Sequence, residues 1–413
     1  MVGPVWDVAV VGAGAAGLMA AIRAAELGRR VLLLEKNRKA GVKILMSGGT
    51  RCNLTHATDN RGIVEAYGPP GRFLHSALAA LSVQDTIDFF EAEGVATKVE
   101  ETGKIFPVSN KAIDVLNALL NRLHRSGATL SLAEPVLDLR QSDGVFTITT
   151  PGRTLSARQV ILTTGGQSYP GSGTTGDGYA FAARFGHIIV APRPALVPIR
   201  VNAPWVAGLR GVTLPDVGLR VRDGETVLMA HRGSLLFAHF GLSGPVALDL
   251  SRAISGHPRP GDLTLEIDLL PATIEAELDA FLRIESSASA KKQLAVVLAS
   301  RLPRSVCDIL LTLAGLPADR RAAGLSKEDR RRLTRLIKNL SLPVIGTLGF
   351  EKAEVTAGGV ALDEVDSRNI RSKLVPNLFI AGEVLDLDGP IGGYNFQSAW
   401  STGWLAGMKA AER

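Results

Sequence analysis

The chain has 413 residues, which is more than one hydrophobic core usually organises, and this length predicts two or three domains. Hydrophobic residues make up 46% of the chain and charged residues 21%, a balance that excludes an intrinsically disordered protein. The two cysteines, Cys52 and Cys307, cannot build a disulfide framework, which favours a reducing compartment.

The amino terminus runs directly into an apolar, strand-like segment. We see no basic region followed by a small-residue cleavage site, so we expect no signal peptide and a cytoplasmic protein. The apolar stretch at 8–22 is interrupted by Gly12, Gly14 and Gly17. We interpret it as strand, turn and helix, and we expect no membrane association.

The first forty residues predict a βαβ unit. Its strands are expected at 7–11 and 31–34, on either side of a helix at about 15–27. Helical patterns follow around 72–93 and 110–126. A βαβ opening is typical of an α/β domain with a parallel sheet.

The later segments predict one discontinuous domain with two insertions. Short alternating runs between 128 and 164 are typical of antiparallel strands that return to a final parallel strand. The predicted organisation is an FAD-binding domain at 1–190 and 345–413, a β-rich, barrel-like domain at 191–270, and a helical subdomain at 271–344.

A glycine-rich turn joins the first predicted strand to the first helix. Residues 12–17, GAGAAG, match the GxGxxG pattern of dinucleotide-binding proteins. Gly12 allows the tight turn, Gly14 lets the backbone reach a pyrophosphate, and Gly17 lets helix and strand pack closely. The helix N-terminus then favours the anion. Glu35, at the end of the second strand, is placed to accept hydrogen bonds from ribose hydroxyls; a glycine turn without function is the alternative.

Two later strands indicate FAD rather than NAD. Residues 160–166 are an apolar strand ending in Thr-Gly-Gly, and residues 378–383 are a strand ending in Gly-Glu. Both resemble strand ends of the glutathione-reductase-type FAD domain. We find no second GxGxxG, so we expect no separate nicotinamide domain. NAD(P)H would then reach the flavin as a diffusible electron donor, or the substrate or another protein would exchange the electrons.

The longest motif lies at residues 41–55. Its sequence, GVKILMSGGTRCNLT, resembles the K-x-x-x-S-G-G-G-R-C-N-x-T signature of the BaiN/YhiN-like bacterial flavoproteins. Segments at 169–178, 232–245 and 381–397 resemble the same family, so the similarity covers nearly the whole chain. The resemblance implies an FAD-binding Rossmann domain with inserted β and helical parts, and one branch is linked to reduction of conjugated steroid enones. Thr50 departs from the signature, because a glycine usually stands there.

The candidate cofactor site combines these motifs. The segment around Lys43 and Arg51 is predicted to be a glycine-rich loop that contacts the flavin, with an ordinary surface loop as the alternative. The N-terminus of the last helix, near Tyr394, is expected to place N–H donors at the pyrimidine edge of the flavin, with structural capping as the alternative. The predicted cofactor-binding residues are Gly12, Gly14, Ala15, Ala16, Gly17, Glu35, Lys36, Lys43, Ser47, Gly48, Gly49, Arg51, Cys52, Asn53, Pro135, Val136, Thr164, Gly165, Gly166, Asp177, Gly382, Glu383, Asp386, Gly392, Gly393, Tyr394 and Asn395.

Three residues bear on the chemistry. His239 and Tyr169 are the candidate catalytic residues, because each could donate a proton beside the carbon that accepts a hydride. A packing or loop role is the alternative for both. Cys52 could be a redox thiol, but a lone cysteine without a CxxC partner is more often a small buried side chain. The seven histidines show no ligand spacing, and we expect no metal site.

The basic charge is local. Residues 320–338 hold eight Lys or Arg against two Asp or Glu, while the whole chain carries +6. We interpret this segment as the solvated face of a helix whose buried stripe includes Leu333, Leu336 and Ile337. Contact with RNA or another polyanion is the alternative.

Together these features predict an FAD-dependent oxidoreductase. Its substrate is expected to be a small organic molecule such as a conjugated alkene, reduced with electrons from NAD(P)H and without a nucleic-acid partner. One alternative is a flavin-dependent RNA-modifying enzyme that docks through 320–338, and another is a non-catalytic flavin-binding redox protein. The oligomeric state does not follow from the sequence.

Overall fold

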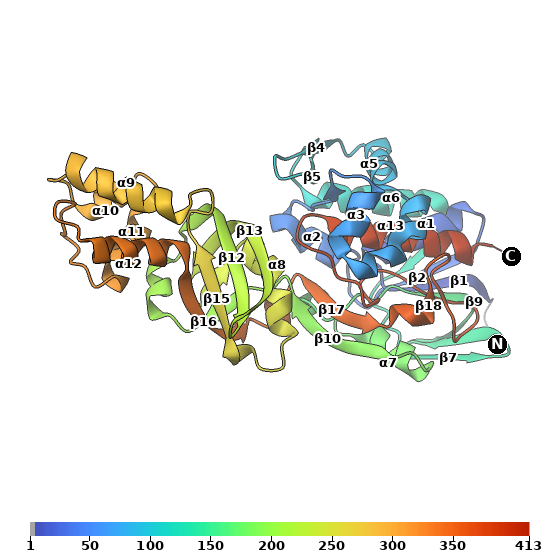
Figure 1. The fold of residues 1–413 in the computed structure, drawn as a ribbon. Helices are drawn as coiled ribbons and strands as arrows, with labels where there is room; N and C mark the ends of the chain where they lie inside the picture. The colour runs from blue at the N-terminus through green and yellow to red at the C-terminus, as the bar shows by residue number, and fades with distance from the viewer. Residues whose placement is uncertain (1–4, 413) are drawn as a thin grey trace. The chain divides into compact units, whose positions relative to one another are not determined.

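The computed structural model describes residues 5–412, and Figure 1 shows their fold. The chain forms two compact units. The first contains the residues up to Pro194 and from Ala353 on, and the second contains the residues from Ala195 to Lys352. Each unit has its own cluster of buried hydrophobic residues, as expected of a structural domain.

The first unit is built on a sheet of nine strands, counted within the described residues. β1 (Trp6–Val11) lies between β2 (Val31–Leu34) and β9 (Thr154–Leu162), parallel to both, and α1 (Ala15–Glu26) connects β1 to β2. Two further strands pair in parallel: β6 (Thr129–Ser131) with β2, and β20 (Leu378–Ile380) with β9. Antiparallel pairings extend the sheet from β9 to β8 (Val145–Thr149) and β7 (Asp138–Ser142), and from β20 to β19 (Arg371–Ser372) and β18 (Val365–Asp366).

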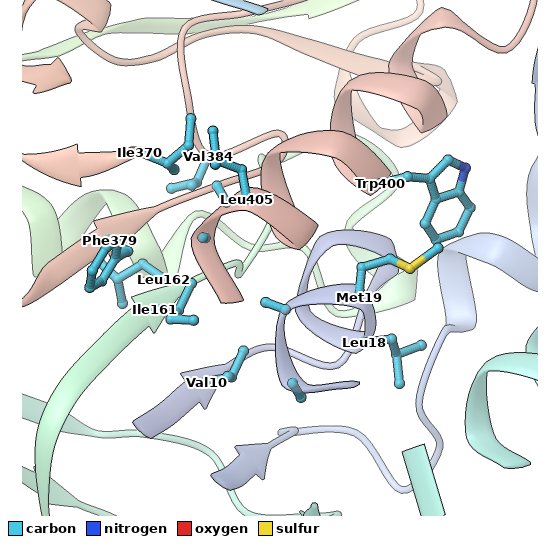
Figure 2. Packing of buried hydrophobic residues seen from close by; sticks show 14 of the residues in the cluster. Val10, Leu18, Met19, Ile161, Leu162, Ile370, Phe379, Val384, Trp400 and Leu405 are labelled. Carbon is cyan, nitrogen blue, oxygen red and sulfur yellow. The ribbon is translucent and has the colours of Figure 1, made fainter. Parts of the chain in front are cut away.

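Buried apolar strands and a close helix pair form the core of the first unit. All four residues of β2 are buried, as expected of a strand in a sheet covered on both faces. α13 (Tyr394–Ala410) packs directly on α1. The two backbones are so close at Gly403 that an added Cβ would lie only 2.2 Å from the carbonyl oxygen of Ala16. Figure 2 shows Met19 of α1, with Trp400 of α13, in this core.

Shorter elements complete the first unit. A three-stranded sheet joins β3, β5 and β4, and a two-stranded sheet joins β10 and β17. These elements are α2 (Val42–Thr50), β3 (Thr55–His56), α3 (Asn60–Tyr67), α4 (His75–Ala80), α5 (Val83–Ala92), β4 (Thr97–Val99), β5 (Lys104–Pro107), α6 (Ala112–Ser126), α7 (Asp177–Arg184), β10 (Ile189–Ala195) and β17 (Val355–Val360).

The second unit is a closed antiparallel barrel with helices. In spatial order its strands are β11 (Ile199–Val201), β14 (Gly241–Ser243), β13 (Thr226–Ala238), β12 (Thr213–Asp223), β15 (Leu263–Asp268) and β16 (Leu340–Thr347). Side chains along β15 alternate between buried and half-buried, which is the pattern of a barrel wall. The helices are α8 (Pro245–Ser255), α9 (Glu275–Ala288), α10 (Leu294–Leu298), α11 (Arg304–Leu313) and α12 (Lys327–Lys338).

The predicted fold class is confirmed: a Rossmann domain carries an inserted barrel and a group of helices. One local prediction is wrong, because the segment around Lys43 begins as a helix rather than as a loop. α2 starts at Val42 and breaks only at Ser47, beyond which Gly48 and Gly49 have left-handed φ angles of 55° and 66°. Within residues 5–412, no helix is both long and apolar enough to cross a membrane.

Candidate functional site

The turn between β1 and α1 has the geometry of a phosphate cradle. Gly12 has φ 104°, and a Cβ there would lie 2.6 Å from the carbonyl oxygen of Thr163. A Cβ at Gly17 would lie 1.8 Å from the carbonyl oxygen of Gly12, so strand and helix pack too closely for any side chain. A Cβ at Gly14, by contrast, would have no other atom within 4 Å. The backbone there faces open space, as an approaching pyrophosphate requires.

The N-terminus of α1 is open to an anion. Within the described chain, no side chain caps it and no acidic residue lies in its first turn, which includes Ala15 and Ala16. The first N–H groups of a helix have no partner inside the helix, and its dipole favours negative charge at that end. A helix end of this kind fits the pyrophosphate of a dinucleotide.

Glu35 ties this turn to the end of β2. Its buried carboxylate accepts hydrogen bonds from the N–H groups of Ala13 and Asn37, each at 2.8 Å. The backbone of Glu35 also accepts a bond from the N–H of Glu134 at 2.9 Å. This bond brings the segment of Pro135 and Val136, which directly follow Glu134, close to Glu35, the acidic residue that the sequence predicts to bind ribose.

A charged cluster lies where β9 and β20 end. The ammonium group of Lys43 donates to the hydroxyl of Ser168 at 2.6 Å and to the Oε2 atom of Glu383 at 2.5 Å. The Oε1 atom of Glu383 accepts from the Ser168 hydroxyl at 2.7 Å and from the N–H of Thr356 at 2.9 Å. Ligands of open α/β sheets bind outside the carboxyl ends of the strands, which is where this cluster lies.

Ser168 and Thr356 are the members of this cluster that sequence reasoning missed. The Thr356 hydroxyl oxygen accepts from the N–H groups of Gln167 and Ser168, at 2.8 and 2.9 Å. A Cβ at Gly166 would lie 2.4 Å from the same oxygen, so the Thr-Gly-Gly turn must be glycine here. A single serine and a single threonine have no local motif that could have identified them.

Several buried polar atoms of the first unit have no hydrogen-bond partner among the described residues. Among them are Asn53 Oδ1, the Tyr179 hydroxyl and Thr164 Oγ1, the last of which lies just after the end of β9. Burial, and then the negative charges of Glu383 and Asp386, raise the pKa of Tyr179. Buried polar groups are nearly always hydrogen-bonded, so these atoms fit a site that a polar ligand completes.

The N-terminus of α13 meets the segment that follows Cys52. Gly393 has φ 97°, and a Cβ there would lie 2.5 Å from the carbonyl oxygen of Thr55. The Nδ1 atom of His56 lies 3.1 Å from the carbonyl oxygen of Gly392, and the His56 ring stacks on Tyr394 at 4.7 Å. As at α1, no side chain caps α13 within the described chain. The two motifs predicted at the flavin therefore lie side by side.

Two further contacts define the strand ends. A Cβ at Gly382 would lie 2.8 Å from the Cβ of Ala16, so the end of β20 approaches the first turn of α1. Gly165 has φ 74° and also lies close to a side chain, because a Cβ there would be 3.0 Å from Thr174.

The Asn395 side chain closes the loop that precedes α13. Its Oδ1 atom accepts a hydrogen bond from the N–H of Gly389 at 2.8 Å.

Other predicted residues are engaged with protein groups. Lys36 pairs with Asp177 at 2.5 Å. Arg51 pairs with Glu100 at 2.7 Å, and its guanidinium carbon lies 3.9 Å from the centroid of the Phe106 ring. The Ser47 hydroxyl donates to the backbone carbonyl of Ile44. Burial raises the pKa of Cys52 to about 12, which keeps the thiol protonated and does not favour a redox role.

The two candidate proton donors belong to different compact units. Tyr169 belongs to the first unit, has φ 55° and is 38% exposed. His239 belongs to the second unit, where it is exposed in the turn between β13 and β14 and its ring lies 5.0 Å from Phe240. No cluster of three or more potential metal ligands is found within residues 5–412.

The sequence of residues 6–409 matches the model of the HI0933-like protein Rossmann domain. The chain belongs to this family. It is 35% identical over 402 residues to the ribosomal RNA dihydrouridine synthase of Escherichia coli (strain K12), covering 97% of this chain and 96% of that protein. It is 32% identical over 409 residues to the 3-dehydro-bile acid delta(4,6)-reductase of Clostridium scindens, covering 98% and 99%.

A solved structure shows the same fold. The 3-ketosteroid-delta4-(5alpha)-dehydrogenase of Rhodococcus jostii RHA1 matches with a TM-score of 0.51 at 17% identity, covering 100% of this chain and 98% of that one. The family match confirms the predicted resemblance to the BaiN/YhiN-like group and the prediction of an FAD-dependent oxidoreductase.

Proposed function

We propose that this protein uses FAD to reduce the uracil ring of a uridine in ribosomal RNA. The observation that carries this choice is the 35% identity to a ribosomal RNA dihydrouridine synthase over 97% of the chain. Dihydrouridine forms when the carbon–carbon double bond of uracil, which is conjugated to a carbonyl, is saturated. The name of the Clostridium relative describes reduction of double bonds in a 3-dehydro bile acid, so both relatives support one type of reaction.

The first unit provides the residues that would hold FAD. The turn at Gly12, Gly14 and Gly17 would receive the pyrophosphate, and Glu35 would accept hydrogen bonds from a ribose. The N-terminus of α13, at Gly393, would stabilise negative charge on the flavin through the positive end of its dipole. When bound and reduced, the flavin supplies a hydride. NAD(P)H is proposed as the diffusible electron donor.

The reaction also needs a proton and a place for negative charge. Addition of a hydride to one carbon of the double bond places charge on the conjugated carbonyl, and a proton on the neighbouring carbon completes the reduction. Tyr169 directly follows Ser168, which is bonded to Lys43. A positive φ at a non-glycine residue is concentrated at functional sites, so we favour Tyr169 over His239 as the proton donor.

A conjugated 3-oxosteroid is the second candidate substrate. The 32% identity to the bile acid reductase over 98% of the chain favours it. Its bond type is the same as in uracil, so the cofactor site in the first unit serves both candidates. The two differ in what surrounds the reactive bond: a compact apolar ring system in one case, and a large polyanion in the other.

One experiment separates the two substrates. The purified holoprotein is incubated without oxygen with NADH or NADPH and with either in-vitro-transcribed ribosomal RNA or a conjugated 3-oxosteroid. We expect mass spectrometry to find one uridine that has gained two hydrogens, with one nicotinamide oxidised per uridine. Turnover of the steroid with unchanged RNA would overturn the proposed substrate and leave the reaction type standing. A flavin that neither nicotinamide reduces would overturn the proposed donor.

A further inference from the structure

The basic charge of the chain is concentrated in the helices of the second unit. Residues 283–338 contain thirteen Lys or Arg and five Asp or Glu, a net charge of +8, while the whole chain carries +6. The excess therefore extends well beyond the segment at 320–338. Proteins that bind nucleic acid neutralise phosphates with Lys and Arg, so a local excess of this size points to a polyanion.

Ion pairs neutralise only part of this charge. The paired side chains are Arg304 with Asp308, Arg330 with Asp279, Arg332 with Asp329, and Lys338 with Asp268. Within residues 283–338, eight exposed cations have no acidic partner among residues 5–412. Arg301 lies over the Phe281 ring and Arg283 lies on α9. The other six, which we name the basic patch, are Lys291, Lys292, Arg321, Lys327, Arg331 and Arg335.

Backbone pairing brings two parts of the basic patch together. The N–H of Leu294 donates to the carbonyl oxygen of Arg320 at 2.7 Å, and the N–H of Ala322 donates to the carbonyl oxygen of Lys292 at 2.9 Å. Gln293 and Arg321 form the β-bridge between these bonds. Lys292 and Arg321 therefore lie on adjacent extended segments, although nearly thirty positions separate them in the sequence.

α12 carries the other half of the basic patch. Lys327, Arg331 and Arg335 recur every four residues, which places them along one exposed face over roughly 12 Å of helix. The opposite face contains the buried Leu333 and Ile337. The helices that form this part of the second unit, α9 to α12, are grouped together in Figure 1.

This arrangement works against the stability of α12 itself. Like charges four residues apart destabilise a helix, and Lys327 stands at the first helical position, where the dipole disfavours a cation. Ser326 caps the helix by accepting a hydrogen bond from the N–H of Asp329. Within the described chain, however, no acidic side chain forms an ion pair with Lys327, Arg331 or Arg335. An external polyanion would supply the missing negative charge.

We propose that the basic patch docks the sugar–phosphate backbone of the RNA that carries the substrate uridine. This inference rests on the proposed function. Phosphate contacts hold an RNA in position without selecting its sequence, while selection of the base is left to the cofactor site. A uridine inside a folded RNA must leave its stack before it can react, and binding of the remote backbone offsets the cost of that step.

The test compares two triple variants of the full-length holoprotein. The patch variant carries Lys327→Gln, Arg331→Gln and Arg335→Gln. The control carries Arg61→Gln, Arg140→Gln and Arg368→Gln in the first unit, where each side chain is at least 80% exposed. Both lose the same charge. Thermal unfolding and anaerobic flavin reduction by NAD(P)H verify that each variant is folded and loaded.

Fluorescence anisotropy with a labelled ribosomal RNA fragment then measures affinity against salt. We expect the slope of log K against log salt to fall by about 2 to 3 in the patch variant, because each lost phosphate contact removes about 0.7 to 0.9. The KM for RNA should rise while kcat and flavin reduction stay unchanged. Equal slopes and KM values in both variants would overturn the docking surface alone. Wild-type protein that neither binds nor reduces RNA would overturn the proposed function and this inference with it.

Discussion

The first compact unit contains 31 of the 44 glycines in the chain, and its 25 Lys and Arg nearly balance its 24 Asp and Glu. The second unit has 13 glycines and a surplus of five cations. The first unit forms its site by close backbone approach and by charges paired inside the protein. The second presents unpaired charge on exposed side chains. The FAD and the RNA proposed above would require these different surfaces, because the cofactor stays bound whereas the RNA must leave after each turnover.

The largest expected effect is that of Gly17→Ala, which tests the backbone side of the comparison. The new Cβ would meet the carbonyl oxygen of Gly12 at 1.8 Å, so β1 and α1 must separate. We expect a loss of roughly 3 kcal/mol or more in the free energy of unfolding, together with loss of FAD. Denaturant unfolding and an absorbance titration with FAD measure both quantities.

Gly14→Ala is the matched control for that substitution. Its Cβ meets nothing within 4 Å, and Gly14 has an ordinary φ of −84°. We expect the free energy of unfolding to stay near the wild-type value while the affinity for FAD falls. Wild-type affinity in this variant would break the interpretation that the backbone at Gly14 faces the pyrophosphate.

Lys43→Met tests the paired charges of the first unit. The substitution leaves the carboxylate of Glu383 without its cation, and the Glu383 side chain is only 20% exposed. We expect a loss of about 1 to 3 kcal/mol, part of which Glu383→Gln restores in the double variant. The patch variant of α12, by contrast, should stay within about 0.5 kcal/mol of wild type. An equal loss of stability in the two variants would contradict the distinction between charges paired inside the protein and unpaired charges on its surface.

Glu134→Gln sharpens the same distinction through pH. A hydrogen bond from Arg153, supported by Ser131 and Thr150, holds the pKa of Glu134 at about 2, below its usual 4.5 and against the opposing effect of burial. The folded state therefore binds its proton less readily, so this stabilisation is complete above pH 4.5 and is lost as pH falls toward 2. We expect the variant to be about 1 kcal/mol less stable at pH 6, and the difference to shrink at pH 3. A difference that does not change with pH would show that the carboxylate charge is not what stabilises this loop.

The elements that the sequence predicts well are those with a local pattern. The apolar run at 31–34 coincides with β2, and the last helix begins at Tyr394 as expected. The GxGxxG turn is recognisable because the contacts of Gly12 and Gly17 admit only glycine, so a structural requirement appears directly in the sequence. α8 was not predicted, because the glycines and prolines around it are typical of a β-rich region.

The contacts that the sequence could not predict join distant residues through side chains. The Lys43 ammonium meets Ser168 and Glu383, which lie 125 and 340 residues away along the chain. Thr356 enters the same cluster through one hydroxyl and one N–H. A serine or threonine carries no signal at its own position, because its role depends on which strand ends the fold brings together.

Thr50→Gly has the smallest expected effect and bears on why the first unit uses glycine. Thr50 has φ 68° and is exposed, at a position where the related signature usually has glycine. Relief of the left-handed backbone strain should raise the free energy of unfolding by about 1 to 2 kcal/mol. The greater conformational freedom of glycine in the unfolded chain should lower it by about 0.5 to 1 kcal/mol. We expect a net gain of up to about 1 kcal/mol in denaturant unfolding. Thr102→Gly, at an exposed turn residue without a positive φ, should lose stability instead. If both variants lose stability equally, strain at Thr50 is not the reason for glycine in the signature, and approach of a ligand becomes the better explanation.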